Sequence, residues 1–418
     1  MYKEPGLEGA DSTVWLRKVR PPPVADRRAL SDTSGMTDLE RILPLWRELE
    51  AAAADYVLAT VVAVEGSSYR KPGACMLLAP DGRRAGTVSG GCLEAQVASR
   101  AWWLTAEGPR VQRYSTAEED GERPYGSGCG GVVHLLLERR STAGPLLAAL
   151  EQAFQGRIPL AVATVLEGAQ LGRRAFAGLE PETAEKLRPV AGPAGEAALQ
   201  MLAEAALASG HSMEKRISLQ EAEALVWADF RPARPGLWIF GAGDDAQPLL
   251  RLAKELGWFV TVADGRAHLA TRDRFPLADE VHVLAMNELP RGPFPALAHL
   301  HPQGAAAILT HSFDQDVRVL AGLLTLATPP AYLGVLGPHR RTRELLAEAT
   351  RLLNLPASSA DAQAERWLAQ LHAPMGLDLG AESPEAIALC IVAEVQKSLA
   401  AATGRPLREL RAVTAARL

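Results

Sequence analysis

The spacing of apolar and polar positions divides the chain into two regions with different rhythms. In the first region, apolar residues recur at helical spacing over 39–54, and an uninterrupted apolar run predicts a buried strand at 56–64. Two further runs flank Pro80-Asp81-Gly82, the pattern of a β-hairpin. Because strands and helices mix here without a strict β-α-β order, this region is predicted to be α+β. The hairpin strands are expected at 74–79 and 84–88, further strands at 132–137 and 160–166, and helices at 91–104, 145–154 and, with a break near Gly192, 181–209.

In the second region, strands alternate regularly with helices after a linker rich in proline and arginine at 230–236. This alternation predicts a parallel, doubly wound sheet. The expected fold class is therefore α/β, an N-terminal α+β domain followed by a Rossmann-like domain. A last helix is expected to begin with Ser383 as its N-cap and Pro384 in its first turn. The strands are expected at 237–240, 258–263, 281–284, 306–309 and 332–336, and the helices at 246–256, 317–326, 339–353 and 385–399.

These patterns also place the domain boundaries. Residues 1–37 contain Pro21-Pro22-Pro23 and no clear apolar period, so a flexible tail is expected there. The first domain is predicted at 38–230 and the Rossmann-like domain at 236–402, with a C-terminal tail at 403–418.

Composition narrows the class of protein. Of the 418 residues, 48 % are hydrophobic and 22 % are charged, values that are ordinary for a soluble globular protein. The net charge of −5 gives no support to nucleic-acid binding, and no apolar run is long enough to predict a membrane span. Four cysteines without a C-x-x-C pattern fit a reducing cytoplasm rather than a disulfide scaffold or a structural zinc site.

Two glycine-rich loops each carry one cysteine, Cys92 within 89–94 and Cys129 within 126–131. Glycine allows backbone N–H groups to approach a ligand closely, and successive N–H groups form nests for anions. A thiol at the start of a helix is activated by the helix dipole. The two loops therefore predict a site for an anionic, sulfur-reactive ligand. The structural alternatives are a small residue in a tight turn for Cys92 and a hinge or bulge for Cys129.

The other candidate groups of the first domain have equally simple structural interpretations. Cys75 and Cys390 lie in apolar surroundings and are expected to be buried packing. In the polar loop 66–73, Arg70 and Lys71 could supply positive charge to a phosphate, or they could be the basic edge of a solvated turn. Glu94 could be an ordinary acid in the first turn of a helix.

The loop Gly241-Ala242-Gly243-Asp244-Asp245-Ala246 follows a predicted strand and opens a helix, as in a dinucleotide-binding fingerprint. Asp264 lies 21 residues after Gly243, where an acid would bind the ribose of NAD(P), and His311 follows a later strand at the ligand-binding edge. The two carboxylates beside the loop would repel a pyrophosphate. The alternative is therefore that Gly241 and Gly243 serve packing only.

With these motifs in place, the chain resembles the XdhC/CoxI family, the maturation factors of xanthine and carbon-monoxide dehydrogenases, over roughly 39–401. The resemblance implies a chaperone that binds molybdenum cofactor, protects it during sulfuration and delivers it without catalytic turnover. It implies Cys92 and Cys129 near the metal or pterin and Arg70 and Lys71 at the anionic end. The remaining cofactor-binding residues that it implies are Ser68, Gly90, Gly91, Glu94, Gly130 and Gly131. The motifs that carry it are 66–73, 89–94, 129–131, 241–243, Thr310-His311 with Asp314 and Asp316, 332–337 and 373–380.

The resemblance also implies partners. They are an apo molybdenum hydroxylase such as xanthine dehydrogenase, a cysteine desulfurase, and a second copy of the chain in a homodimer. Two other interpretations stay open from the residues themselves. One is an NAD(P)-dependent oxidoreductase that uses the Rossmann domain, and the other is an interaction scaffold whose loops are all structural.

Overall fold

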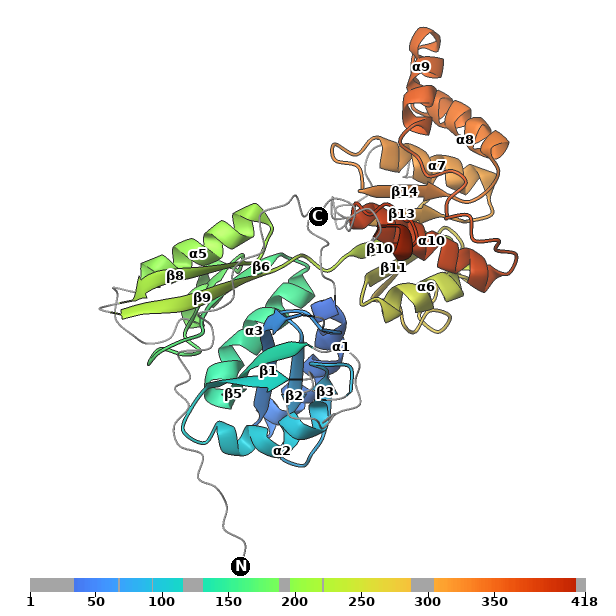
Figure 1. Ribbon diagram of the computed structural model, residues 1–418. Helices are drawn as coiled ribbons and strands as arrows, with labels where there is room; N and C mark the ends of the chain where they lie inside the picture. Colours follow the sequence, from blue (N-terminus) through green and yellow to red (C-terminus); the bar gives the residue numbers. More distant parts are fainter. Residues whose placement is uncertain are drawn as a thin grey trace, which may run out of the picture. The chain divides into compact units, whose positions relative to one another are not determined.

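A computed structural model describes residues 34–66, 68–91, 93–115, 131–187, 196–219, 222–286 and 304–410. The chain forms two compact units that divide between Ala233 and Arg234, within the linker expected at 230–236 (Figure 1). Helix α1 (Ser34–Ala51) opens the first unit, so the last residues of the segment expected to be a tail are helical.

The first unit contains an antiparallel sheet with the strand order β3-β2-β1-β5-β4. Side chains of β1 alternate between its two faces, as the period of a strand requires. Leu58 packs with α1 and α3, whereas Val57 and Ala59 pack with α2. The predicted hairpin is confirmed, with Leu77 opposite Ala85. The elements are β1 (Val57–Glu65), β2 (Cys75–Leu78), β3 (Arg84–Gly86), α2 (Glu94–Leu104), β4 (Arg110–Ser115), β5 (Val132–Arg139) and α3 (Arg140–Gly156).

A second antiparallel sheet completes this unit, with the order β7-β6-β9-β8. One face packs on α3 through Val162, and the other packs on α5 through Ala161 and Ala163. The sequence pattern does not predict strands β4, β7, β8 and β9; β8, for example, is a largely exposed edge strand with little apolar alternation. The elements are β6 (Leu160–Val165), β7 (Arg174–Ala177), α4 (Pro181–Lys186), α5 (Glu196–Ser209), β8 (Met213–Leu219) and β9 (Ala222–Arg231).

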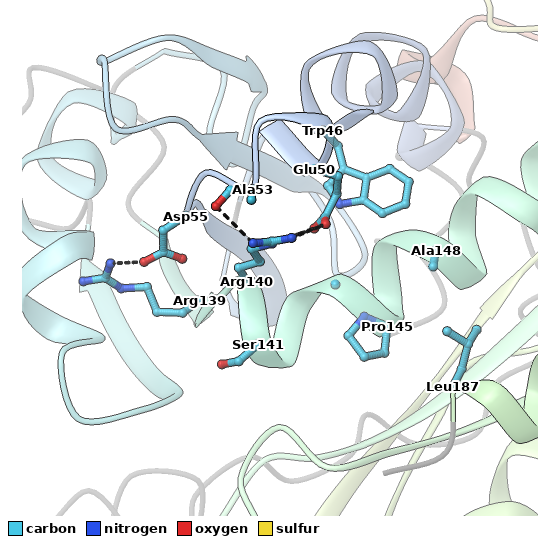
Figure 2. A pocket seen from close by; sticks show the side chains of 11 residues that line it. Trp46, Glu50, Ala53, Asp55, Arg139, Arg140, Ser141, Pro145, Ala148 and Leu187 are labelled. Carbon is cyan, nitrogen blue, oxygen red and sulfur yellow. Dashed lines mark hydrogen bonds and ion pairs between the residues drawn. The ribbon is translucent and has the colours of Figure 1, made fainter. Parts of the chain in front are cut away.

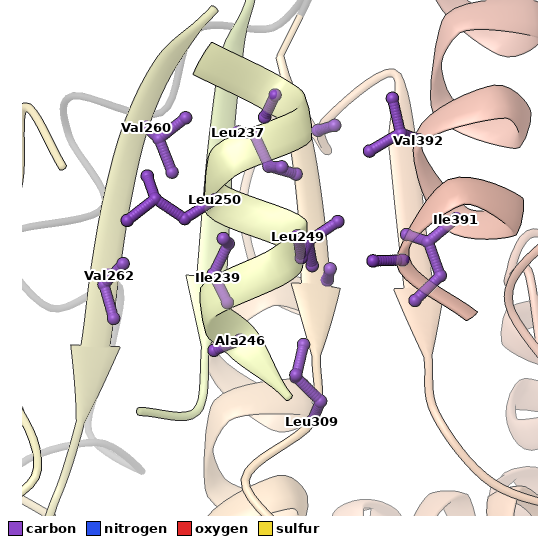
Figure 3. Packing of buried hydrophobic residues seen from close by; sticks show 14 of the residues in the cluster. Leu237, Ile239, Ala246, Leu249, Leu250, Val260, Val262, Leu309, Ile391 and Val392 are labelled. Carbon is purple, nitrogen blue, oxygen red and sulfur yellow. The ribbon is translucent and has the colours of Figure 1, made fainter. Parts of the chain in front are cut away.

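The second unit is the predicted Rossmann-like domain. Its five strands are parallel in the order β12-β11-β10-β13-β14, which is the doubly wound arrangement. Helices α6 and α10 cover one face, where Leu249 and Ile391 belong to the same buried cluster as Ile239 (Figure 3). Helices α7 and α8 cover the other face. The elements are β10 (Gly236–Phe240), α6 (Ala246–Glu255), β11 (Phe259–Asp264), β12 (Glu280–Val283), β13 (Ala305–Ile308), α7 (Phe313–Leu324), β14 (Tyr332–Val335), α8 (His339–Leu352), α9 (Ala357–Leu368) and α10 (Pro384–Leu399).

The predicted start of the last helix is also confirmed, because the Ser383 side chain accepts a hydrogen bond from the backbone N–H of Ala386. The sequence pattern does not predict helix α9; Trp367 is its one buried side chain among those described. Within the described part of the chain, no helix has both the length and the apolar character that crossing a membrane requires.

Candidate functional site

The candidate loops of the first unit lie at one edge of its first sheet. Strand β1 ends there at Glu65, opposite Val132, where β5 begins. Strand β2 begins near this edge and β3 ends near it, because the two strands run antiparallel next to β1. The described residues of the segments 66–73 and 87–93 and Gly131, which precedes β5, therefore lie at the same edge, which we call the loop edge. Cys92, Cys129 and Gly130 lie outside the described residues.

The loop before α2 is organised by Glu94, whose side chain is buried. Its carboxylate accepts hydrogen bonds from the backbone N–H groups of Ser89 and Gly91, both at 2.9 Å, and of Gly90 at 3.3 Å. It also accepts from the hydroxyl of Ser89 at 2.6 Å and from that of Thr87. Burial alone would raise the pKa of Glu94, but these hydrogen bonds lower it to about 2.

This arrangement corrects the prediction that Gly90 and Gly91 present their N–H groups to an external anion. Both groups are already bonded to the carboxylate of Glu94, as is that of Ser89. These N–H groups do form an anion-binding nest, but the anion that they bind is the carboxylate of Glu94. Glu94 therefore positions the loop rather than contacting a ligand directly.

Arg70 also turns inward, contrary to its predicted role at the anionic end of a ligand. Its guanidinium donates to the carboxylate of Asp38 on α1, and both side chains are largely buried. Ser68 donates its hydroxyl hydrogen bond to the carbonyl of Arg70 at 2.9 Å, so it too stabilises the loop. Lys71 is exposed and is the basic side chain of this loop that stays on the surface.

The same loop is tied to the second sheet at its other end. Arg231 of β9 donates to the carbonyl of Gly73 at 2.7 Å and pairs with Asp229 at 2.6 Å. The loop 66–73 is thus anchored through Arg70 to a helix and through Gly73 to a strand.

Asp38, the partner of Arg70, has a perturbed pKa. Burial raises the pKa of Asp38 to about 6, although Arg70 opposes that effect.

The two described cysteines are packing residues, as expected. Cys75 and Cys390 are both buried. Burial raises the pKa of the Cys75 thiol, which keeps it in the unreactive form. Among the residues whose placement is described, no group of three His, Cys, Asp or Glu side chains could hold a metal ion. The predicted metal ligands, Cys92 and Cys129, are not among them.

Sequence reasoning missed several residues of the loop edge. His134 of β5 is buried, and its Nε2 lies 2.7 Å from Oε1 of Glu65. Tyr69 lies within a loop that the sequence singles out, but its exposure cannot be inferred from the pattern. No local sequence pattern indicates that Asp38 and Arg231 hold this loop, since the groups they bond to are far away in the sequence.

In the second unit, the glycine loop packs closely against the loop that follows β13. Gly241 has φ of +133°, and a Cβ atom there would lie 2.4 Å from the carbonyl oxygen of Leu309. At Gly243, a Cβ would lie 2.6 Å from a carboxylate oxygen of Asp245. His311 has φ of +58°, and its Nε2 lies 2.8 Å from Oδ2 of Asp245. His311 and Asp245 therefore join the loops after two neighbouring strands.

Asp264 does not fit the predicted role of binding a ribose. Its side chain has no exposed surface and accepts from the backbone N–H of Ala242 at 2.8 Å. Arg266 donates three more hydrogen bonds, from its backbone N–H at 2.8 Å, from Nε at 2.9 Å and from Nη2 at 2.7 Å. Burial raises the pKa of Asp264, but the bonds from Arg266 and Ala242 outweigh it and hold the pKa below its usual value.

NAD(P) is therefore a poor match for this crevice. Both oxygens of the ribose-binding acid are bonded within the protein, and Arg266, which could meet a phosphate, neutralises that acid. Asp245 adds negative charge where a pyrophosphate would lie, whereas the charge of Asp244 is offset by Arg274, whose Nη2 lies 2.8 Å from its Oδ1. Gly241 is required by the packing of its own loop, because a Cβ atom there would meet backbone atoms of Leu309, whereas a Cβ atom at Gly243 would meet only the end of the Asp245 side chain.

A separate pocket of about 900 Å³ lies at the opposite edge of the first sheet, beside α1 and the start of α3 (Figure 2). Its charged groups are paired, Arg139 with Asp55 at 2.6 Å and Arg140 with Glu50 at 2.8 Å. Because β5 runs from Val132 to Arg139, this pocket and the loop edge lie at opposite ends of that strand. The sequence pattern does not predict this pocket.

Two family models match the chain. The XdhC and CoxI family model matches residues 49–115, which include the loops 66–73 and 87–93. The XdhC Rossmann domain model matches residues 237–395, which include the crevice around Asp264.

Individual proteins match in the same regions. A Bacillus subtilis protein named as a probable xanthine dehydrogenase subunit is 29 % identical over 352 residues, covering 81 % of this chain and 92 % of that protein. The molybdenum cofactor insertion chaperone PaoD of Escherichia coli is 37 % identical over 108 residues, which are 24 % of this chain and 31 % of PaoD. A crystal structure described as that of a xanthine dehydrogenase from Bacillus halodurans aligns with a TM-score of 0.62 and 28 % identity, covering 87 % of this chain and 96 % of that chain.

Proposed function

The chain belongs to the XdhC and CoxI family, and from this membership we propose that it is a maturation factor that binds molybdenum cofactor and supplies it to a molybdenum enzyme. The observation that carries the proposal is the meeting of the family's loops at one edge of the first sheet, held in place by Glu94, Arg70 and Arg231. The match to a molybdenum cofactor insertion chaperone supports it.

The cofactor is the cargo of this protein, and its chemistry suits the loop edge. Molybdopterin carries a phosphate, a planar pterin and a dithiolene that holds the metal. The exposed ammonium group of Lys71 would attract the phosphate. Thiolates are suitable ligands for a soft metal–sulfur centre, so Cys92 and Cys129 would serve that end of the cofactor. Gly130 and Gly131 would allow the backbone to approach it closely.

The finer steps belong to the same proposal. We infer that the bound cofactor is protected while a cysteine desulfurase provides sulfur, and that it then passes to an apo molybdenum hydroxylase of the xanthine dehydrogenase type. We also infer that the protein acts as a homodimer in the cytoplasm. The similarity of the B. subtilis relative to this chain over most of both lengths is consistent with such a client.

The test is to express the protein in cells with and without an intact molybdopterin pathway and to purify it anaerobically. We expect molybdenum and a fluorescent oxidised pterin to copurify only from the cells with the pathway. Cys92→Ser and Cys129→Ser should reduce the bound molybdenum, whereas Cys390→Ala, which removes a buried thiol, should not. Absence of both molybdenum and pterin from the wild-type protein under replete conditions would reject the proposal.

The same variants separate this function from that of a scaffold with purely structural loops. A scaffold predicts that Cys92→Ser and Cys129→Ser leave client maturation unchanged. Loss of client activity, with the variant still folded by circular dichroism, would reject the scaffold hypothesis.

A further inference from the structure

Tyr69 is an exposed aromatic side chain of the loop edge, in the segment 66–73. Its exposed fraction is 76 %, although large apolar side chains in this unit are mostly buried. The residues on either side of it turn toward the protein, Ser68 to the carbonyl of Arg70 and Arg70 to Asp38. The loop is therefore fixed on both sides of a ring that points to the surface.

The ring lies over the backbone of the neighbouring loop. A Cβ atom at Gly90 would lie 2.8 Å from Cδ1, 3.1 Å from Cε1 and 3.3 Å from Cγ of Tyr69. Gly90, with φ of +95°, is in turn held by Glu94. Any larger residue at 90 would displace the ring, so Tyr69 can lie here only because residue 90 has no side chain. The ring thus connects the loop 66–73 with the loop that leads to Cys92.

Folding gains little from a ring exposed to this extent, because the hydrophobic effect scales with the apolar area removed from water. The anchored ring is instead suited to a ligand with a flat aromatic surface, since offset stacking on an aromatic side chain stabilises such a ligand. Lys71, two residues further on, is exposed and adds a positive charge to the same surface.

We propose that Tyr69 is the stacking platform for the pterin ring of the cofactor, seated on Gly90, and that Lys71 beside it binds the phosphate of the same molecule. This inference rests on the proposed function, since it names the residues that recognise the two ends of the cargo. The organic part of the cofactor is thus recognised by Tyr69 and Lys71, and the two cysteines play no part in this recognition.

The test compares the dissociation constant for molybdopterin among variants, measured anaerobically with the bound pterin quantified by fluorescence after oxidation. Tyr69→Ala should weaken binding about tenfold, the loss of one stacking contact. Tyr69→Phe and Tyr69→Trp should stay within about twofold of the wild type, because each keeps a ring. Trp103→Ala is the matched control, since Trp103 is 75 % exposed but lies at the far end of α2 and should not matter.

The outcomes separate this inference from the proposed function. If the wild type binds molybdopterin and Tyr69→Ala binds it equally well, the platform is rejected while the proposed function stands. If Tyr69→Phe is as weak as Tyr69→Ala, the hydroxyl is the binding group and stacking is rejected. If the wild type does not bind molybdopterin at all, the proposed function fails and the platform fails with it.

Discussion

Replacing Glu94 by glutamine should loosen the loop edge in a manner that depends on pH. The carboxylate accepts hydrogen bonds from four consecutive backbone N–H groups, Val88 to Gly91, and from two hydroxyls. A glutamine amide presents one oxygen and one NH₂ group, so part of these donors would face another donor. Buried donors without an acceptor are costly, at about 1–3 kcal/mol each.

The magnitude follows from the pKa of Glu94, which is lowered from 4.5 to about 2. This difference corresponds to about 3 kcal/mol in favour of the folded state when the carboxylate is ionised. Because the folded pKa is depressed, the contribution is complete above pH 4.5 and is lost as the pH falls toward 2. Glu94→Gln should therefore destabilise the loop by about 3 kcal/mol at pH 7 and by much less near pH 3.

Hydrogen exchange measured by mass spectrometry on the full chain gives a local readout of this effect. Protection of the amides of Ser89 and Gly91 should fall about 100-fold in Glu94→Gln at pH 7, the ratio that corresponds to about 3 kcal/mol. Glu107→Gln is the matched control, because that side chain is exposed on the loop after α2. Unchanged protection in Glu94→Gln, within about threefold of the wild type, would refute the assignment of Glu94 as the organiser of the loop.

Three further predictions follow from single contacts. Burial raises the pKa of Asp38 from 3.8 to about 6, so the contribution of its protonated form to stability is complete below pH 3.8 and is lost as the pH rises through 6. The free energy of unfolding, measured with urea, should therefore rise by up to about 3 kcal/mol on acidification across this window. Asp38→Asn should abolish this rise. Gly241→Ala, whose Cβ would lie 2.4 Å from a backbone carbonyl, should lower the melting temperature of the second unit far more than Gly380→Ala, where φ is also positive but no atom lies within 4 Å; equal effects would contradict the packing role. Calorimetric titration with NAD and NADP at millimolar concentration should give no binding heat, and clear binding that is lost in Asp264→Asn would overturn our interpretation of that carboxylate.

Elements whose signal is local could be predicted from the sequence. The hairpin around Pro80-Asp81-Gly82 and the helix start at Ser383 each depend on a few adjacent residues, and both are confirmed. The regular alternation after residue 236 was enough to predict the parallel sheet. Strand β8 was missed because its side chains are mostly exposed, so it lacks the apolar alternation by which strands are recognised.

For the candidate site, the order of residues was enough to show which loops carry the chemistry, because glycine, cysteine and basic residues cluster in short motifs. Which groups in those loops face a ligand depends on the folded chain. Arg70 is neutralised by Asp38, 32 residues away, and Asp264 is buried and bonded to Ala242, 22 residues away. A charged group is available to a ligand only if no partner inside the fold compensates it. That condition depends on contacts between distant segments, which a local sequence motif does not specify.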